Sequence, residues 1–176
     1  TEDPSVHATT NNINDTDYEV IIETPVGKQK AFYRKSLNSP WHKPIKRIIA
    51  SEEEMKVATW RESRRKWSWD QGRYDKLCEE WAGLGAPTMY MPRVTVQKLF
   101  IDEMGIQDTI YAIVDYPDAC EAYFDALQHN HEQLIEVINE SPIQIINFGD
   151  NVHSGTLPPK LFEKYVLPVY QRRSEL

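Results

Sequence analysis

A six-residue, mostly apolar run, Ile143–Phe148, constrains the fold more than any other part of this sequence. Pro142 precedes the run and Gly149 follows it, and both residue types interrupt regular structure. A short apolar run between such residues is typical of a central strand in a parallel sheet, with helices covering both faces. Because parallel strands need crossover connections, which are usually helices, the run predicts an α/β fold.

Helical patterns lie on both sides of this strand. The spacing of apolar residues predicts a long helix over 117–140 before it, and two prolines at 158 and 159 open a last helix over 160–176. The other predicted elements are a strand over 86–91 and helices over 52–65, 73–84, 95–104 and 108–115. This alternation of strands and helices over residues 51–176 predicts a parallel sheet or a barrel.

The first fifty residues follow a different pattern. Residues 1–17 are polar and aperiodic, which predicts a frayed terminus. Tyr18–Glu23 and Lys28–Arg34 alternate with period two around a Pro-x-Gly turn, which predicts an antiparallel hairpin. Residues 43–50 supply a third strand, so we expect a small antiparallel sheet over 18–50 ahead of the helical part.

Composition excludes several classes of protein. The chain has 20 basic and 27 acidic residues, and its net charge of −7 argues against a nucleic-acid or anionic-membrane partner. No apolar run approaches the roughly 18 residues that a membrane helix needs. Two cysteines cannot form a disulfide-rich framework or a four-cysteine zinc site, and they favour a cytoplasmic location.

The carboxyl ends of parallel strands are the working edge of an α/β fold, and two clusters of polar residues fall there. Asp150, Asn151 and His153 follow the strand over 143–148, and Tyr90 and Arg93 lie at the end of the earlier strand. A carboxylate, an amide and an imidazole so close together bind polar groups or hold a proton.

Other interpretations of these residues stay open. Local pattern alone favours Asp150 and Asn151 as residues that cap a turn through side-chain to backbone hydrogen bonds. Asp150 and His153 are metal-ligand types, but two ligands do not make a zinc site. Arg93 has the geometry to clamp a carboxylate or phosphate, although a lone surface arginine is more often simply solvated.

The second half of the chain resembles the uroporphyrinogen decarboxylase superfamily. In INFGDNVHSGTLPPKLFEKYVLPVYQRR, a strand ends in an acidic residue and a polar loop leads to a helix with the spacing PP-x-x-F-x-x-Y-x-x-P-x-Y. YAIVDYPDACEAYFDAL is similar to the family's Asp-x-Pro helix start, and PTMYMPRVTVQKLFIDEMG to its earlier strand–loop–helix. The resemblance covers residues 75–176. The hairpin with ETPVG looks like the branch that includes the corrinoid-linked methyltransferases.

This resemblance implies a (β/α)₈ barrel and one of two chemistries. Methyltransferase members move a methyl group between a small substrate or thiol and a corrinoid protein, commonly with zinc held by a His-x-Cys…Cys set. Decarboxylase members remove the acetate carboxyls of a tetrapyrrole without a cofactor. The chain contains no His-x-Cys and lacks the early arginine motif of the decarboxylases. The resemblance carries over Asp150 as the catalytic residue, with Tyr90, Arg93, Asn151 and His153 binding substrate.

A barrel of this kind takes about 250 residues, whereas the chain has 176. We therefore expect an N-terminal fragment that is inactive alone, with zinc ligands beyond Leu176 and none within the chain. A corrinoid protein and a homodimer are the partners that the resemblance leaves open. A third hypothesis is a non-catalytic interaction domain that uses Trp67 and Trp69 with their neighbouring arginines, although amphipathic packing explains that stretch more simply.

Overall fold

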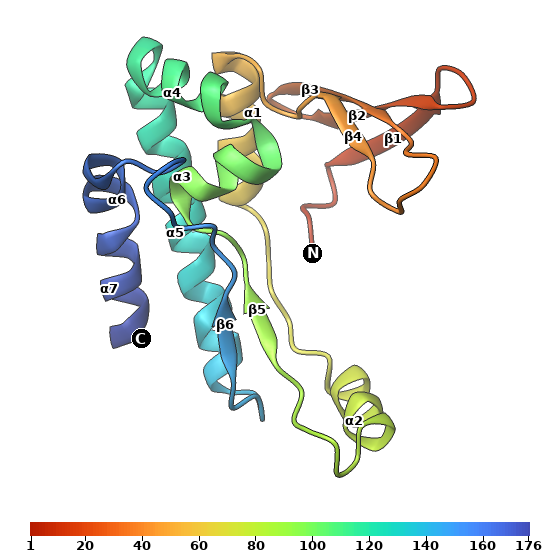
Figure 1. The fold of residues 1–176 in the computed structure, drawn as a ribbon, viewed down its shortest axis with the longest axis vertical. Helices are drawn as coiled ribbons and strands as arrows, with labels where there is room; N and C mark the ends of the chain where they lie inside the picture. Colours follow the sequence, from red (N-terminus) through yellow and green to blue (C-terminus); the bar gives the residue numbers. More distant parts are fainter.

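The computed structural model describes residues 1–176 and shows a mixed α/β fold (Figure 1). A four-stranded antiparallel sheet lies at one end, helices form the body, and two parallel strands lie beside the long helix α5. The strands are β1 (His7–Asn12), β2 (Asp17–Thr24), β3 (Gly27–Arg34), β4 (Lys43–Lys46), β5 (Met89–Met91) and β6 (Ile146–Phe148). The helices are α1 (Glu52–Glu62), α2 (Gln71–Glu80), α3 (Thr95–Lys98), η1 (Leu99–Glu103), α4 (Ile106–Asp115), α5 (Pro117–Asn139), α6 (Pro159–Tyr165) and α7 (Leu167–Glu175).

The predicted hairpin is confirmed as β2 and β3, which pair antiparallel in the register Thr24↔Gly27. The turn closes where the Thr24 hydroxyl donates to the Gly27 carbonyl at 2.9 Å. Gly27 has a φ of +148°, a conformation that side-chain-bearing residues rarely adopt. The third predicted strand is also present, but β4 covers only four of the eight predicted residues.

The prediction of a frayed terminus over 1–17 is wrong for β1. This strand pairs with β2 from His7↔Glu23 to Asn12↔Tyr18 and completes the sheet order β1-β2-β3-β4. All six of its residues are exposed, so no alternation of apolar and polar side chains marks it in the sequence. Backbone hydrogen bonds to a neighbouring strand hold it, and sequence patterning does not reveal such bonds.

Helix α1 connects the sheet to the helical body and has Ser51 as its N-cap. The Ser51 hydroxyl accepts the Glu54 backbone N–H at 3.2 Å. The Glu54 carboxylate accepts the Ala50 N–H at 2.8 Å and pairs with Lys46 of β4 at 2.7 Å. One carboxylate therefore closes the helix start and binds the sheet to it. The helix ends at Glu62, three residues before the predicted end.

The long predicted helix is confirmed as α5, and α1 packs along it (Figure 1). Residues on its predicted core stripe are buried, except that Ala126 is half-buried. The buried members are Ala119, Tyr123, Leu127, Leu134, Ile135 and Ile138. The first half of α5 belongs to the main core, and the second half forms a smaller cluster with Met91 of β5.

Strands β5 and β6 pair in parallel, with Met89 opposite Ile146 and Met91 opposite Phe148. Both are three residues long, half the predicted length. The expectation that the second strand is covered on both faces is wrong, because every residue of β6 is exposed. The reason is that this sheet has only two strands, so β6 has no neighbour on its other edge.

Three more of the predicted helices differ from the structure. The helix predicted over 95–104 forms as the short helix α3 followed by the π-helix η1, which ends at Glu103. The last helix is divided at Val166, because Pro168 lacks the N–H that a continuous helix would bond to the carbonyl four residues earlier. Helix α2 ends at Glu80, and the apolar residues expected on its core face are not buried: Trp81 and Leu84 are exposed. None of the helices is both long and apolar enough to cross a membrane.

The stretch of tryptophans and arginines after α1 is occupied by internal contacts. The Arg61 and Arg65 guanidinium groups both pair with Glu2, and the Arg64 guanidinium lies 4.7 Å from the centre of the Trp60 ring. Trp67 packs against the smaller core cluster. These contacts are what the packing interpretation of this stretch predicts.

Candidate active-site edge

The parallel pairing of β5 and β6 brings the two predicted clusters to one edge of the sheet. Because Met91 lies opposite Phe148, the loops that begin at Pro92 and Gly149 leave the strands side by side. The segments are 56 residues apart in sequence, yet the Arg93 guanidinium donates a hydrogen bond to the Gly149 carbonyl. The structure thus brings Arg93 and Asp150 together at the carboxyl ends of the strands.

Asp150 is the best-fixed polar side chain at this edge. Its Oδ1 accepts the Val94 backbone N–H at 3.2 Å, and its Oδ2 accepts the Tyr170 hydroxyl at 2.7 Å. The carboxylate therefore joins the loop after β5 to helix α7. Burial, and then the hydrogen bond to Asp150, raises the pKa of the Tyr170 phenol, so this hydroxyl stays protonated and continues to donate.

Arg93 braces the same edge. Besides its bond to the Gly149 carbonyl, its Nε lies 3.4 Å from the Asp102 carboxylate. The side chain is half-buried, with a quarter of its surface, 25%, exposed. These contacts hold the two loops together, so the guanidinium has a structural task in addition to any contact with a substrate.

The remaining predicted site residues lie further out. Tyr90 is 66% exposed, and its ring lies against Gly149, where an added Cβ would come within 3.2 Å of a ring carbon. His153 is exposed, and its Nδ1 accepts the Gly155 N–H at 3.2 Å. Asn151 is exposed too. No hydrogen bond connects the side chain of Asn151 or His153 to Asp150, so the structure does not gather the whole predicted set.

Two residues behind this edge were not predicted from the sequence. The Arg173 guanidinium is buried, donates to the His131 Nδ1 at 2.6 Å and lies 5.7 Å from the centre of the Phe148 ring. Burial, and then the nearby charge of Arg173, lowers the pKa of His131 to about 3, so the imidazole is neutral and accepts this bond. Helical spacing offered a signal, because His131 lies four residues after Leu127 and three before Leu134 on the core stripe.

The residues around Asp150 do not fit a zinc site. No group of three or more His, Cys, Asp or Glu residues is placed to hold a metal ion. His153, the nearest metal-ligand type along the chain, uses one ring nitrogen for its own loop. A structural or catalytic zinc needs at least three protein ligands, so no chemical step at this edge is assigned to a metal.

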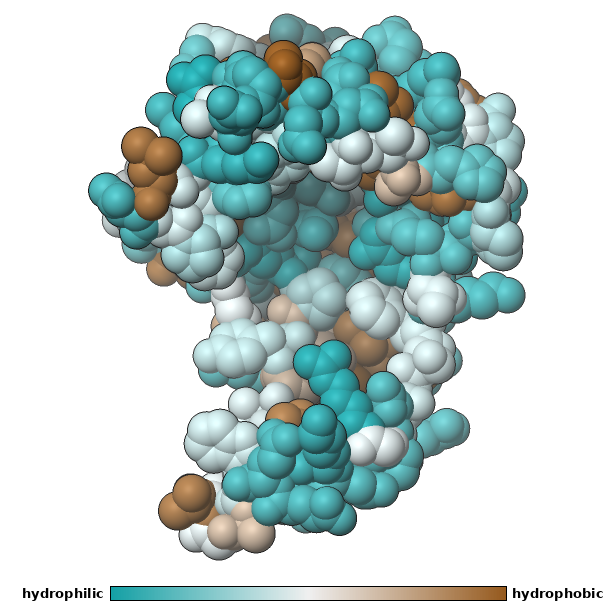
Figure 2. Space-filling view, turned by 90° about the vertical axis from the view of Figure 1, so that its right-hand side faces the viewer, coloured by the Kyte–Doolittle hydropathy of each residue, from teal (hydrophilic) through white to brown (hydrophobic).

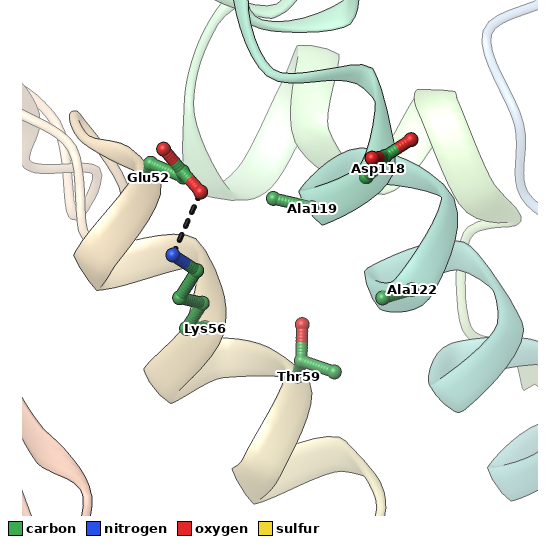
Figure 3. Close-up of a pocket in the computed structure, with 6 residues that line it drawn as sticks. All are labelled: Glu52, Lys56, Thr59, Asp118, Ala119 and Ala122. Carbon is green, nitrogen blue, oxygen red and sulfur yellow. Dashed lines mark ion pairs between the residues drawn. The ribbon is translucent and has the colours of Figure 1, made fainter.

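A separate hollow of about 270 Å³ lies between the first turns of α1 and α5 (Figure 3). Glu52 and Lys56 line its α1 side and pair with one another at 2.7 Å, while Asp118 lies across from them on α5. The two charged groups on the α1 side are therefore already paired with one another. The hollow has no residue in common with the edge around Asp150, and it is not part of that site.

Comparison with known proteins gives no relative for this chain: no family model, no curated protein and no solved structure matches it.

Proposed function

We propose that this chain is part of a barrel enzyme of the uroporphyrinogen decarboxylase type, from the branch that transfers methyl groups between a small substrate or thiol and a corrinoid protein. One observation carries the proposal: a carboxylate is fixed where two parallel strands end. Val94 and Tyr170 hold Asp150 at the carboxyl edge of β5 and β6. That edge is where α/β enzymes place their catalytic groups.

The proposed task of Asp150 is to orient the substrate. An ionised carboxylate has about four lone-pair positions, and Val94 and Tyr170 occupy two of them. The free positions can accept a hydrogen bond from a substrate N–H, O–H or S–H group, or hold the proton that such a group loses. Because two partners fix the carboxylate, it does not need to reorganise when the substrate arrives.

Tyr90 of β5 and Arg93 of the loop after β5 complete the proposed site. Tyr90 offers an exposed ring to an apolar part of the substrate. Arg93 is charged and partly exposed, and can balance an anionic group while it braces the edge. Asn151 and His153 lie on the exposed loop that follows β6, so they can contact only the solvent-facing side of a substrate.

The test is to assay the complete gene product for the two reactions, methyl transfer and decarboxylation. Purified protein is incubated with methylcobalamin and a panel of thiols, and the corrinoid absorbance spectrum reports demethylation. In parallel, uroporphyrinogen is supplied, and the products are separated by the number of carboxyl groups that they retain. We expect a corrinoid change that needs both thiol and protein, with no porphyrinogen turnover. Turnover of porphyrinogen alone would assign the decarboxylase reaction instead, and inertness in both assays would favour a non-catalytic domain.

A further inference from the structure

A second site lies away from Asp150, in a groove of about 530 Å³ between α2, β5 and the second half of α5. The molecule narrows between the body that carries the antiparallel sheet and the lobe that carries α2 (Figure 2). Pro87 and Thr88, just before β5, line the groove, whereas Asp150 follows the end of β6. Its volume is in the range of about 300–1,000 Å³ that small-molecule sites occupy.

Aromatic rings make up much of its wall, from Trp67, Trp69, Tyr74 and Tyr90. The two indoles are held in place, because Trp67 Nε1 donates to Asn130 at 2.8 Å and Trp69 Nε1 donates to Gln71 at 2.8 Å. The ring centres of Trp69 and Tyr74 are 5.5 Å apart, with planes tilted by 52°. With the indole N–H groups already bonded, these rings present mainly their apolar surface to a ligand.

Aliphatic side chains line the groove too. Leu134 and Ile138 of α5 and Met89 of β5 contribute to it, and all three belong to the smaller core cluster or pack against it. Trp67 also packs against this cluster, so the apolar surface open to a ligand comes mainly from the other rings and favours a flat, apolar molecule.

The groove also contains one basic side chain. Two charged residues line it, Asp70 and Arg73. The Asp70 carboxylate caps α2 by accepting the Arg73 backbone N–H at 2.9 Å. The Arg73 side chain is exposed and forms no ion pair. Because Asp70 is held at the start of α2 by this cap, the Arg73 guanidinium is the group in the groove that can pair with an anion.

We propose that this groove binds a flat aromatic anion, with its ring against Trp69 and Tyr74 and its acidic group at Arg73. The ligand class is an arene sulfonate or carboxylate. Stacking on the rings supplies the apolar part of the binding, and the guanidinium selects the charge. The groove shares Tyr90 with the site proposed around Asp150, whereas Arg73, Trp67 and Trp69 do not belong to that site.

The test uses 8-anilinonaphthalene-1-sulfonate as the anionic probe and the uncharged N-phenyl-1-naphthylamine as its counterpart. Probe fluorescence and quenching of tryptophan emission give the two dissociation constants. Arg73→Gln removes the charge, and Lys76→Gln removes a charge from the same helix outside the groove. We expect Arg73→Gln to weaken the sulfonate about fivefold or more and to leave the uncharged probe unchanged. Lys76→Gln should change neither constant by more than about twofold.

A second variant locates the binding. Trp69→Ala should weaken both probes, whereas Trp41→Ala removes an exposed tryptophan outside the groove and should leave both constants unchanged. Thermal unfolding of each variant shows that the fold is kept. Equal loss of both probes in Arg73→Gln, or binding that survives Trp69→Ala, would overturn the proposal. So would sedimentation that reveals a dimer dissociated by Trp69→Ala, because a second copy would then occupy the groove.

Discussion

At the scale of single residues, the Asp150 carboxylate depends on contacts from two distant parts of the chain. Val94 lies 56 residues before it, and Tyr170 lies 20 residues after it. The position of Asp150 was predictable, because it follows a recognisable strand. Its partners were not, because a hydroxyl on a later helix gives no local signal of where it points. The Arg173–His131 contact spans 42 residues and was missed for the same reason.

Removing the Tyr170 hydroxyl tests the Asp150 contact without changing charge. Tyr170→Phe deletes the donor to Oδ2 and keeps the ring that packs on Phe148 and Phe162. We expect the free energy of unfolding to fall by about 1–2 kcal/mol in urea titrations. Tyr111→Phe is the control, because Tyr111 is exposed, and should cost less than about 0.5 kcal/mol. Equal effects of the two variants would show that the hydroxyl contact is not formed.

At the scale of elements, local sequence pattern predicted the helices and strands whose own residues contain a turn, a cap or an apolar stripe. Hairpin β2–β3 has its Pro-x-Gly turn, α1 has its cap, and α5 has its apolar stripe. Elements that depend on their neighbours were predicted less well. Polar β1 exists because β2 offers hydrogen bonds, and β6 is exposed because no further strand lies beside it.

The junction between η1 and α4 depends on one glycine. Gly105 has a φ of +101°, and its N–H bonds to the Leu99 carbonyl at 2.9 Å to close the preceding turn. Because an added Cβ disfavours this conformation, we expect Gly105→Ala to lower the free energy of unfolding by about 1–2 kcal/mol. Gly85→Ala is the matched control, since nothing lies within 4 Å of a Cβ there and its φ is not positive. A similar small effect of both substitutions in urea unfolding would contradict this view of the junction.

At the scale of the whole molecule, α5 is the element around which the helical body is built. Helices α1, α3, α4 and α7 contact it, while the antiparallel sheet joins the body through α1 and β3 (Figure 1). The buried contact between Arg173 of α7 and His131 of α5 fastens the last helix to this centre. Because Arg173 also lies over the Phe148 ring, the contact supports the edge that carries Asp150.

This arrangement makes overall stability depend on pH. The pKa of His131 is lowered from 6.5 to about 3 by burial and by Arg173, so below pH 6.5 the unfolded chain binds a proton that the folded chain does not. The free energy of unfolding should therefore fall as the pH decreases from about 6.5 towards 3.

Burial raises the pKa of Glu62, and this acts in the opposite direction, because the folded chain then binds a proton more readily than the unfolded one. Comparing variants at each pH cancels that contribution. His131→Gln keeps an acceptor for Arg173 but cannot titrate, so its urea-unfolding free energy should fall less steeply than that of the wild type between pH 6.5 and 4. Parallel curves for the two proteins would show that His131 does not lose its proton on folding.

The most direct test of the proposed site is turnover by the complete gene product with Asp150→Asn, measured on the substrate that the wild type accepts. Asparagine keeps the size of the side chain and removes the negative charge, so we expect turnover to fall by about 100-fold or more while the fold is kept. Asp125→Asn, at an exposed position on α5, is the control and should stay within about twofold of the wild type. Full activity of Asp150→Asn would contradict the assignment of the active site to the carboxyl edge of β5 and β6.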